Sequence, residues 1–307
     1  MKGTVTKSMG LWYEVADEKG KAYNCRLKGK FKLQNNKITN PIAVGDKVSF
    51  VLDQVDSEAW IIEDILPRKN YIVRKSPKKK GFGHIIASNL DQAVLIATVS
   101  TPKTSFGFID RFLVTAESFR IPSVILFNKK DLMNEEEVAE LRLKIEEYKA
   151  IGYEAHSISV LKNDGFDIVK SILEGKTSLL SGHSGVGKST IINHLVPEAA
   201  QTISEISGFS NKGIHTTTFA ERFSIDQNTH IIDTPGIKEL GLAEIENNEL
   251  THYFPELREL FGQCKFHNCS HTHEPGCAIE AAYNEGKISP SRYDSYISML
   301  MDDDNRR

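Results

Sequence analysis

The sequence has no long apolar run and few cysteines, and both absences narrow the class of protein. No stretch of about 18 apolar residues occurs, so we expect no membrane-spanning helix. Residues 1–5 lack the apolar stretch of a signal peptide. Only four cysteines occur in 307 residues, and three lie close together, which favours metal binding over disulfides. We therefore expect a cytoplasmic protein, monomeric and without membrane contact.

The net charge of −3 hides an asymmetry between the two ends of the chain. Residues 1–80 carry 17 Lys and Arg against 9 Asp and Glu, a balance of +8, so the remaining 227 residues carry −11. One interpretation is a solvated surface of mixed charge. The other is an N-terminal region that meets a polyanion. Composition alone does not decide between them.

The first part of the chain is rich in short β-like runs. Residues 1–68 contain four or five such runs with turns between them, which predicts an OB-like β-barrel of the kind that binds RNA. Residues 69–90 are expected to form a basic linker, since 68–83 contain seven Lys or Arg and no acid. Its end at Gly81-Phe82-Gly83 is expected to be mobile.

From residue 91 onward, apolar runs alternate with amphipathic segments. Runs at 93–99, 122–127, 153–159, 178–180, 218–225 and 230–232 predict strands, and 109–119, 135–151, 166–173 and 188–195 predict helices. The 135–151 helix has an expected apolar stripe at Val138, Leu141, Ile145 and Tyr148. Such alternation predicts an α/β domain over 91–238, with a parallel sheet covered by helices on both faces. Residues 239–307 are expected to form a mostly helical domain with a frayed tail.

A glycine-rich segment after the predicted strand at 178–180 matches the pattern G-x-x-x-x-G-K-[ST]. Its glycines allow backbone N–H groups to surround phosphate oxygens, and the following helix adds its N-terminal dipole. The lysine neutralises phosphate charge as a catalytic group, and the serine hydroxyl binds Mg²⁺. The expected phosphate-binding residues are Gly182, His183, Ser184, Gly185, Val186, Gly187, Lys188, Ser189 and Thr190.

Asp233-Thr234-Pro235-Gly236 follows the predicted strand at 230–232. An acid at this place holds Mg²⁺, and the N–H of the glycine reaches the γ-phosphate. Alone, a D-x-P-G segment is an ordinary turn. About 50 residues after a phosphate-binding loop it predicts that Asp233 and Gly236 bind the nucleotide and its metal.

Asn128-Lys129-Lys130-Asp131 ends the predicted strand at 122–127 and resembles the N-K-x-D guanine-specificity motif of Ras-like GTPases. Asp131 can accept hydrogen bonds from guanine N1–H and the exocyclic amine, which adenine does not offer in that arrangement. Asn128 is expected to brace the loops, and the stem of Lys129 to cover the base. Ser157 and Ser159 resemble the short motif that supports the base.

The order of these motifs is unusual, because the base-reading motif precedes the phosphate-binding loop and no second N-K-x-D follows residue 236. In ordinary members of the class the phosphate-binding loop comes first. We therefore predict a circularly permuted GTPase, in which the sheet is kept and only the chain ends move. Nucleotide state can then reposition the modules at both ends.

The polar segment 204–218 lies where a switch loop is expected. Thr216 and Thr217 are both candidates for Mg²⁺ binding when the γ-phosphate is present, with Thr217 favoured. Ile237 occupies the place where Ras-type enzymes use a glutamine to orient water. His215 is the nearest polar candidate for that role, so we predict that it is catalytic and that intrinsic hydrolysis is slow.

Three cysteines and a histidine lie within 14 residues, in the spacing C-x4-C-x-H-x5-C. Four nitrogen and sulfur ligands at short spacing are typical of a closed structural zinc site. His267 and His273 are possible substitutes for the histidine, and reduced buried cysteines are the plainer alternative. The expected zinc ligands are Cys264, Cys269, His271 and Cys277.

Together these features resemble the ribosome small-subunit-dependent GTPase A family, also called YjeQ or YloQ. The resemblance covers nearly the whole chain, and Gly213-Ile214-His215-Thr216-Thr217-Thr218 also matches the G-x-H-T-T-T switch of that family. It implies a late-stage 30S assembly factor whose GTPase is stimulated by the small subunit. It also implies that the barrel and the zinc domain bind 16S rRNA.

Two other functions fit part of the sequence. One is a GTP-dependent signalling switch that binds a protein effector, with the barrel as the interaction module. The other is a P-loop kinase, against which the N-K-K-D motif argues. The residues themselves predict a multi-domain protein: an all-β barrel, a permuted α/β GTPase that uses GTP and Mg²⁺, and a helical zinc domain.

Overall fold

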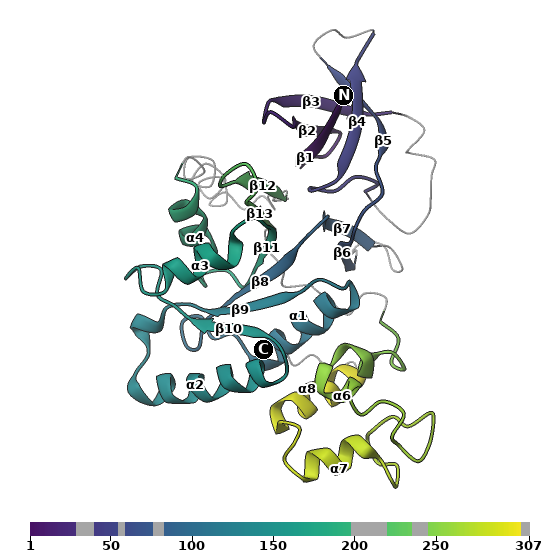
Figure 1. Cartoon of the computed structure of the whole chain (residues 1–307), viewed down its shortest axis with the longest axis vertical. Helices are drawn as coiled ribbons and strands as arrows, with labels where there is room; N and C mark the ends of the chain where they lie inside the picture. The colour runs from purple at the N-terminus through teal and green to yellow at the C-terminus, as the bar shows by residue number, and fades with distance from the viewer. Residues whose placement is uncertain (29–39, 55–58, 76–82, 198–219, 235–244, 302–307) are drawn as a thin grey trace, which may run out of the picture.

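The computed structural model describes residues 1–28, 40–54, 59–75, 83–197, 220–234 and 245–301, without the side chains of Arg74 and Lys75. Its N-terminal part lies at the top of Figure 1, the α/β sheet in the middle and the C-terminal helices below. Among the described helices, none is long and apolar enough to cross a membrane.

The N-terminal part is a closed five-stranded barrel, as predicted. Its strands are β1 (Lys2–Met9), β2 (Trp12–Asp17), β3 (Ala22–Leu27), β4 (Lys47–Leu52) and β5 (Trp60–Ile65). They pair in the order β1-β2-β3-β5-β4, and β1 also pairs with β4, which closes the barrel. Alternating side chains fill the interior, since successive residues of a strand point to opposite faces. Val5, Val15, Phe50 and Ile62 are fully buried there.

The segment after the barrel differs from the expected linker, because it contains a hairpin of β6 (Tyr71–Lys75) and β7 (Gly83–Ser88). Ile72 and Ala87 of this hairpin are fully buried in the core of the α/β domain. In the sequence, the many basic residues of 68–83 make the apolar pattern of these two strands difficult to recognise. Of the segment Gly81-Phe82-Gly83, the first two residues lie outside the described residues and Gly83 begins β7.

The central sheet has the predicted parallel strands. Its strand order is β10-β9-β8-β11-β13, all parallel, followed by β12, which runs antiparallel to β13 and meets β1 of the barrel. The strands are β8 (Gln92–Ala97), β9 (Ser123–Phe127), β10 (Glu154–Ser157), β11 (Thr177–Ser181), β12 (Glu221–Ser224) and β13 (His230–Asp233).

Helices cover both faces of this sheet. One face packs against α1 (Phe106–Ser118) and α2 (Glu135–Ala150), and the other against α3 (Phe166–Leu173) and α4 (Lys188–Leu195). A capping box, in which Asn134 and Glu137 each bond to the other's backbone N–H, fixes the start of α2. Of the stripe expected on α2, Leu141, Ile145 and Tyr148 are buried, whereas Val138 is 38% exposed. The stripe is therefore one turn shorter than predicted.

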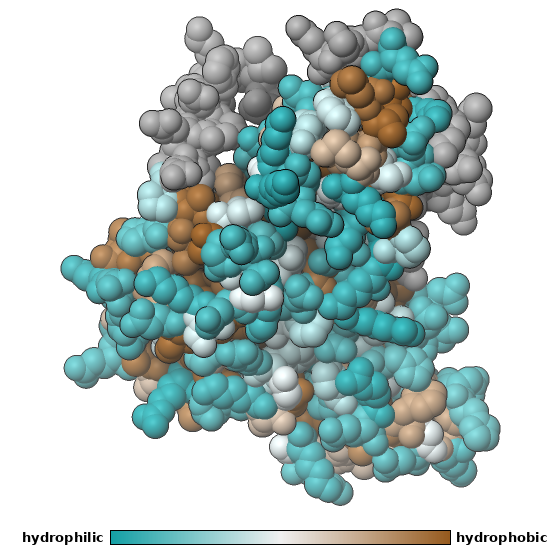
Figure 2. Space-filling view, turned by 45° about the horizontal axis from the view of Figure 1, so that its top comes forward, coloured by the Kyte–Doolittle hydropathy of each residue, from teal (hydrophilic) through white to brown (hydrophobic). Residues whose placement is uncertain are grey.

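The C-terminal part consists of η5 (Leu250–Tyr253), α6 (Pro255–Arg258), α7 (Ala278–Asn284) and α8 (Pro290–Leu300), joined by the loop that carries the cysteines. We call residues 245–301 the C-terminal module. Its apolar core includes Val114 of α1, so it packs directly on the α/β domain. Figure 2 shows that hydrophilic side chains cover most of one face of the molecule, with hydrophobic atoms in separate patches.

Candidate nucleotide and metal sites

The predicted nucleotide-binding segments meet at one edge of the central sheet. The phosphate-binding loop follows β11, Asn128 follows β9, and Asp233 ends β13. Because these strands are parallel, their carboxyl ends lie on the same side, where open α/β sheets bind ligands. Figure 1 shows β8, β9, β11 and β13 in the central sheet, with α3 and α4 beside β11.

Two glycines of the phosphate-binding loop are required by close contacts. Gly182 has a φ of 143°, and a Cβ there would lie 2.2 Å from the carbonyl oxygen of Ile96. Gly187 has a φ of 106°, and its Cβ would lie 2.3 Å from Nδ2 of Asn128. Any side chain at either place would displace the backbone or the asparagine. The loop is thereby seated between β8 and the base-reading segment.

Lys188 begins α4, and its ammonium lies in the loop. Nζ donates to the carbonyl oxygens of His183, at 2.9 Å, and of Gly182. Burial lowers the pKa of Lys188, and the charge of Asp233 opposes that shift. The lysine thus rests on carbonyl oxygens at the place where the sequence predicts phosphate oxygens.

Asp233 lies opposite Lys188 and has an unsatisfied oxygen. Burial raises the pKa of Asp233, and Lys188 opposes the shift. Its Oδ1 is buried without a hydrogen-bond partner among the described residues. A buried carboxylate oxygen without a partner is costly, and Mg²⁺ is a hard cation that prefers oxygen ligands. Asp233 therefore fits a metal-binding role at this edge.

Asn128 links the phosphate-binding loop to the segment after β10. Its Nδ2 donates to the carbonyl oxygen of Val186 at 2.9 Å, and its Oδ1 accepts from the N–H of Val160 at 3.2 Å. The side chain is 3% exposed, so both bonds are shielded from water. Asn128 therefore braces the two loops in the way expected from the sequence.

Asp131 is exposed and lies on the short helix η2 (Lys130–Leu132). The hydroxyl of Ser159 donates to its Oδ1, which fixes the orientation of the carboxylate. Lys129 has a left-handed φ of 65°, and its Nζ donates to the carbonyl oxygen of Thr101 at 2.8 Å. Ser157 ends β10 beside Phe127. Asp131, Ser159, Lys129 and Ser157 therefore all lie at or just after the carboxyl ends of β9 and β10.

The segment between β8 and α1, together with the start of α1, also contacts the phosphate-binding loop, which the sequence did not predict. The ring of Phe108, at the start of α1, lies 4.0 Å from the ring of His183, centroid to centroid. A Cβ at Gly185 would lie 3.6 Å from Cδ of Pro102. No short motif marks these residues. Only the pairing of β8 with β11 brings them to the loop.

Three predicted nucleotide-site residues cannot be placed. His215, Thr217 and Gly236 lie outside the described residues, as do Thr216 and Ile237. Their roles stay predictions.

The second site is formed by the cysteines and histidine of the C-terminal module. One ligand atom from each of Cys264, Cys269, His271 and Cys277 lies within 4.8 Å of the others. Sγ of Cys264 and Sγ of Cys277 are 4.0 Å apart, and both lie 3.5 Å from Nδ1 of His271. A tetrahedral site with typical zinc bond lengths has sulfur–sulfur edges of about 3.8 Å and sulfur–nitrogen edges of about 3.5 Å. The four groups can therefore hold a metal ion.

Hydrogen bonds hold three of these four residues in place. The N–H of Ala278 donates to Sγ of Cys264, and the N–H of Glu280 donates to Sγ of Cys277, both at 3.3 Å. Both donors belong to the first turn of α7, whose dipole favours thiolates there. Tyr293 of α8 donates its hydroxyl to the carbonyl oxygen of His271 at 2.7 Å.

Comparison with known protein families agrees with this architecture. Residues 65–243 match the model of the RsgA GTPase, and residues 2–61 match the model of the RsgA N-terminal domain. The small ribosomal subunit biogenesis GTPase RsgA of Cytophaga hutchinsonii is 50% identical over 307 residues, which is the full length of both chains. This chain belongs to the RsgA GTPase family.

Further relatives extend the similarity. The small ribosomal subunit biogenesis GTPase RsgA 2 of Bacteroides thetaiotaomicron is 48% identical, over 98% of this chain and 97% of its own. Among solved structures, YjeQ from Thermotoga maritima has a TM-score of 0.76 and 35% identity, covering 100% of this chain and 99% of its own. YloQ, described as a circularly permuted GTPase, has a TM-score of 0.73 and 29% identity, covering 100% and 96%. The predicted family and permutation are thus confirmed.

Proposed function

We propose that this RsgA-family chain hydrolyses GTP in the cytoplasm during late maturation of the small ribosomal subunit. The proposal rests on relatives about half identical over the full chain, which are named small ribosomal subunit biogenesis GTPases. The observation that best supports GTP binding is the pair of hydrogen bonds from Asn128, which connect the base-reading segment to the phosphate-binding loop. That brace fixes the distance between a base-recognising carboxylate and a phosphate site.

Asp131 and Ser159 are proposed to select guanine. Ser159 already donates to Oδ1 of Asp131, which would present the carboxylate to the base in one orientation. Guanine satisfies it with two N–H donors, whereas adenine leaves a charged acceptor unpaired. Lys129 would cover the base face with its stem, and Ser157 would support the same loop.

Lys188, Ser189 and Asp233 are proposed to hold the Mg²⁺ complex of GTP. Binding would replace the two carbonyl oxygens around the ammonium of Lys188 with β- and γ-phosphate oxygens. Ser189 and Asp233 would hold the ion, Asp233 through the oxygen that is buried and unpartnered. Mg²⁺ supplies charge neutralisation for the leaving phosphates. The backbone N–H groups of the phosphate-binding loop, 182–190, would donate to the remaining phosphate oxygens.

Hydrolysis is proposed to depend on the switch. Thr217 would add a hydroxyl to Mg²⁺, Gly236 would contact the γ-phosphate, and His215 would position the attacking water. Single-turnover hydrolysis by His215→Ala tests the last role. A lower rate at unchanged GTP affinity is expected, and a rate equal to that of the unmodified protein would remove His215 from the mechanism.

The Cys₃His site is proposed to hold one structural zinc ion. The four protein groups would fill a tetrahedral coordination sphere, which would leave no coordination place for a substrate. Zinc at this site would fix the loop from Cys264 to Cys277 against α7 and α8. We propose residues 1–68, 91–238 and 239–307 as functional units of one monomeric chain, with the barrel and the zinc unit contacting 16S rRNA.

The test is a GTPase assay with purified 30S subunits, together with co-sedimentation of the protein with and without a non-hydrolysable GTP analogue. We expect slow hydrolysis alone, stimulation by the subunit, and tighter association in the GTP-like state. GTP hydrolysis with neither stimulation nor nucleotide-dependent association would overturn the ribosomal role and favour a signalling switch. Failure to bind guanine nucleotides would overturn the proposal as a whole.

A further inference from the structure

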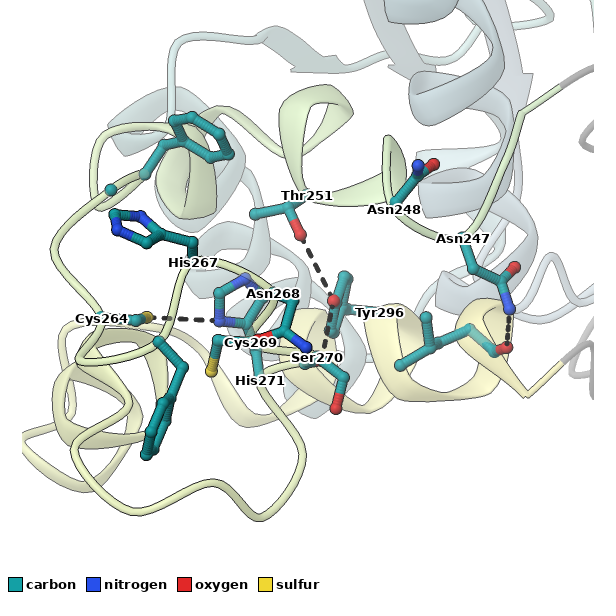
Figure 3. A pocket seen from close by; sticks show the side chains of 14 residues that line it. Asn247, Asn248, Thr251, Cys264, His267, Asn268, Cys269, Ser270, His271 and Tyr296 are labelled. Atoms are coloured by element: carbon teal, nitrogen blue, oxygen red, sulfur yellow. Dashed lines mark hydrogen bonds between the residues drawn. The ribbon is translucent and has the colours of Figure 1, made fainter.

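The C-terminal module contains a cavity of about 340 Å³ beside the Cys₃His site (Figure 3). This volume falls near the lower end of small-ligand pockets, which span about 300–1,000 Å³. Three segments line it: the chain entering η5, the cysteine-bearing loop and α8. In Figure 3, Asn247 and Asn248 lie on one side, His267 on the other, and the Thr251–Tyr296 contact between them.

The inner wall of the cavity is rigid. The hydroxyl groups of Thr251 and Tyr296 lie 3.3 Å apart, and the Tyr296 hydroxyl donates to the carbonyl oxygen of Ser270 at 3.1 Å. Asn247 donates through Nδ2 to the carbonyl oxygen of Leu300 at 3.2 Å. Cys264, Cys269 and His271, three of the four candidate metal ligands, also line the wall. The pocket is therefore formed before any ligand arrives, which lowers the entropic cost of binding.

The remaining lining has a distinctive chemistry. Phe261 is 58% exposed and Phe266 is 42% exposed, although burial is the usual state of such large apolar rings. Asn248 and Asn268 are exposed and also line the pocket. None of the lining residues is Lys, Arg, Asp or Glu. The pocket thus offers flat aromatic faces and neutral groups that both donate and accept hydrogen bonds.

These properties select among ligand classes. A phosphate or carboxylate finds no cationic side chain in the lining, and a hydrocarbon chain would leave the amides unpaired. A nucleobase matches both features, because its faces stack on aromatic rings and its edge pairs with amides. Lys265 is not part of the lining, but its Nζ lies over the ring of Phe266, 5.5 Å from the centroid. A cation there suits the phosphate that follows a base in a strand.

We propose that this pocket takes one unpaired base of an RNA strand, stacked on Phe266 or Phe261 and bonded to the amides of Asn248 and Asn268. The inference rests on the proposed function, since it names the place where the C-terminal module would meet rRNA. It adds a requirement: the RNA must present an unstacked base, as single-stranded loops and ends do, and a continuous duplex does not fit.

Binding of fluorescein-labelled oligoribonucleotides A8, U8 and C8 and of a 12-base-pair RNA duplex tests this, by anisotropy with saturating GDP in the nucleotide site. We expect single strands to bind more tightly than the duplex, and Phe266→Ala to weaken them at least about fivefold, in keeping with loss of one stacked base. Asn268→Ala should alter the preference among the three bases. Leu143→Ala, which removes a more exposed apolar residue on α2, is the control and should change nothing.

Metal content is measured for each variant, because Phe266 and Asn268 lie between Cys264 and Cys269 in the sequence. If a variant loses metal, Phe261→Ala and Asn248→Ala are used in its place. Unchanged oligonucleotide binding by Phe266→Ala and Phe261→Ala would overturn the pocket. Reduced co-sedimentation with 30S subunits at unchanged oligonucleotide binding would also overturn it, and would assign the pocket to a protein partner. In both cases the proposed function stands if the unmodified protein still associates with the subunit.

Discussion

The barrel and the C-terminal module are attached to the central sheet in different ways. The C-terminal module is joined to α1 through Arg292 of α8, which is 1% exposed. Its guanidinium donates to Asp110 of α1 at 2.7 Å and, through two nitrogens, to Glu256 of α6 at 2.6 and 3.2 Å. Ser295 and Tyr148 donate to the same Asp110 carboxylate.

The barrel has a partly exposed strand contact and a smaller buried cluster. Its β1 pairs with β12 at Lys7 and Glu221, whose side chains form a partly exposed ion pair at 2.7 Å. One buried polar contact is Asp46, which accepts from Arg68 at 2.6 Å and from Ser88 of β7 at 2.6 Å. Val44 beside it also packs in the core of the α/β domain. Arg68 is itself partly exposed. The barrel junction thus retains access to water where the α1–α8 junction does not.

This difference in the burial of the ion pairs predicts which module moves more easily on the GTPase core. Rotating the C-terminal module away from α1 would separate buried charges from their partners, which is costly in a low-dielectric interior. Sliding β1 along β12 would disturb one residue pair and one partly solvated ion pair. In addition, β12 directly follows the predicted switch segment. The barrel is therefore the module expected to respond more readily to nucleotide state.

Cys277→Ser is expected to have the largest effect, confined to the C-terminal module. A structural zinc ion supplies roughly 10 kcal/mol or more of local folding free energy, and serine is a poor ligand for it. Serine retains a side-chain acceptor at the start of α7, so any loss of stability reports the missing metal ligand and not a missing helix cap. Metal content and limited proteolysis of residues 245–301 measure the effect. Cys25→Ser, at a buried thiol of the barrel, should keep the metal, and equal metal loss in both variants would contradict the assignment.

Arg292→Met is expected to destabilise the folded chain by about 3–5 kcal/mol, because Asp110 and Glu256 would stay buried without a cation. Urea unfolding followed by circular dichroism measures this. Arg258→Met is the matched control, since Arg258 pairs with Glu117 in an exposed position at 3.3 Å and should cost under about 1 kcal/mol. Equal effects of the two substitutions would show that the buried cluster around Arg292 contributes no more stability than an exposed ion pair.

The nucleotide-binding and metal-ligating segments could be predicted because their chemistry requires residues close together in the sequence. The spacing from Gly182 to Lys188 follows from wrapping backbone around phosphate, and the four candidate ligands span 14 residues. The sheet was predictable for a related reason: strands buried on both faces are continuous apolar runs.

Contacts between distant segments could not be predicted in this way. Asp110 and Arg292 are 182 positions apart, and each is an ordinary charged residue in an amphipathic helix. Phe108 meets His183 only because β8 pairs with β11. The hairpin β6–β7 has the composition of a linker, because lysines and arginines outnumber Ile72, Val73 and Ile85, and the burial of these three depends on the core beneath them.

Arg68→Met is expected to lower the free energy of unfolding by about 2 kcal/mol, which is less than the effect of Arg292→Met. The two substitutions together compare the buried cluster around Asp46 with the one around Asp110. Asp46 would lose its cation but keep the bonds from Ser88 and from the N–H of Ala43, at 2.9 Å. The same urea titration measures it. A loss larger than that of Arg292→Met would reverse the ranking of the two junctions. Asp46→Asn together with Arg68→Met should recover part of the stability, because no buried charge remains unpaired.

Lys7→Ala is expected to have the smallest effect on stability, under about 1 kcal/mol, because the pair with Glu221 is partly solvated. Its value lies in a second measurement. If β1 couples the barrel to the strand after the switch, hydrogen exchange of residues 2–9 should differ between the GDP-bound and GTP-analogue-bound states, and Lys7→Ala should reduce that difference. Lys28→Ala is the control, because it removes an exposed ion pair with Glu63 between two residues of the barrel itself, and it should leave the difference unchanged. Identical exchange of β1 in the two nucleotide states would show that the barrel is held as rigidly as the C-terminal module, since a β1–β12 junction that yields to the switch must change the protection of its own amides.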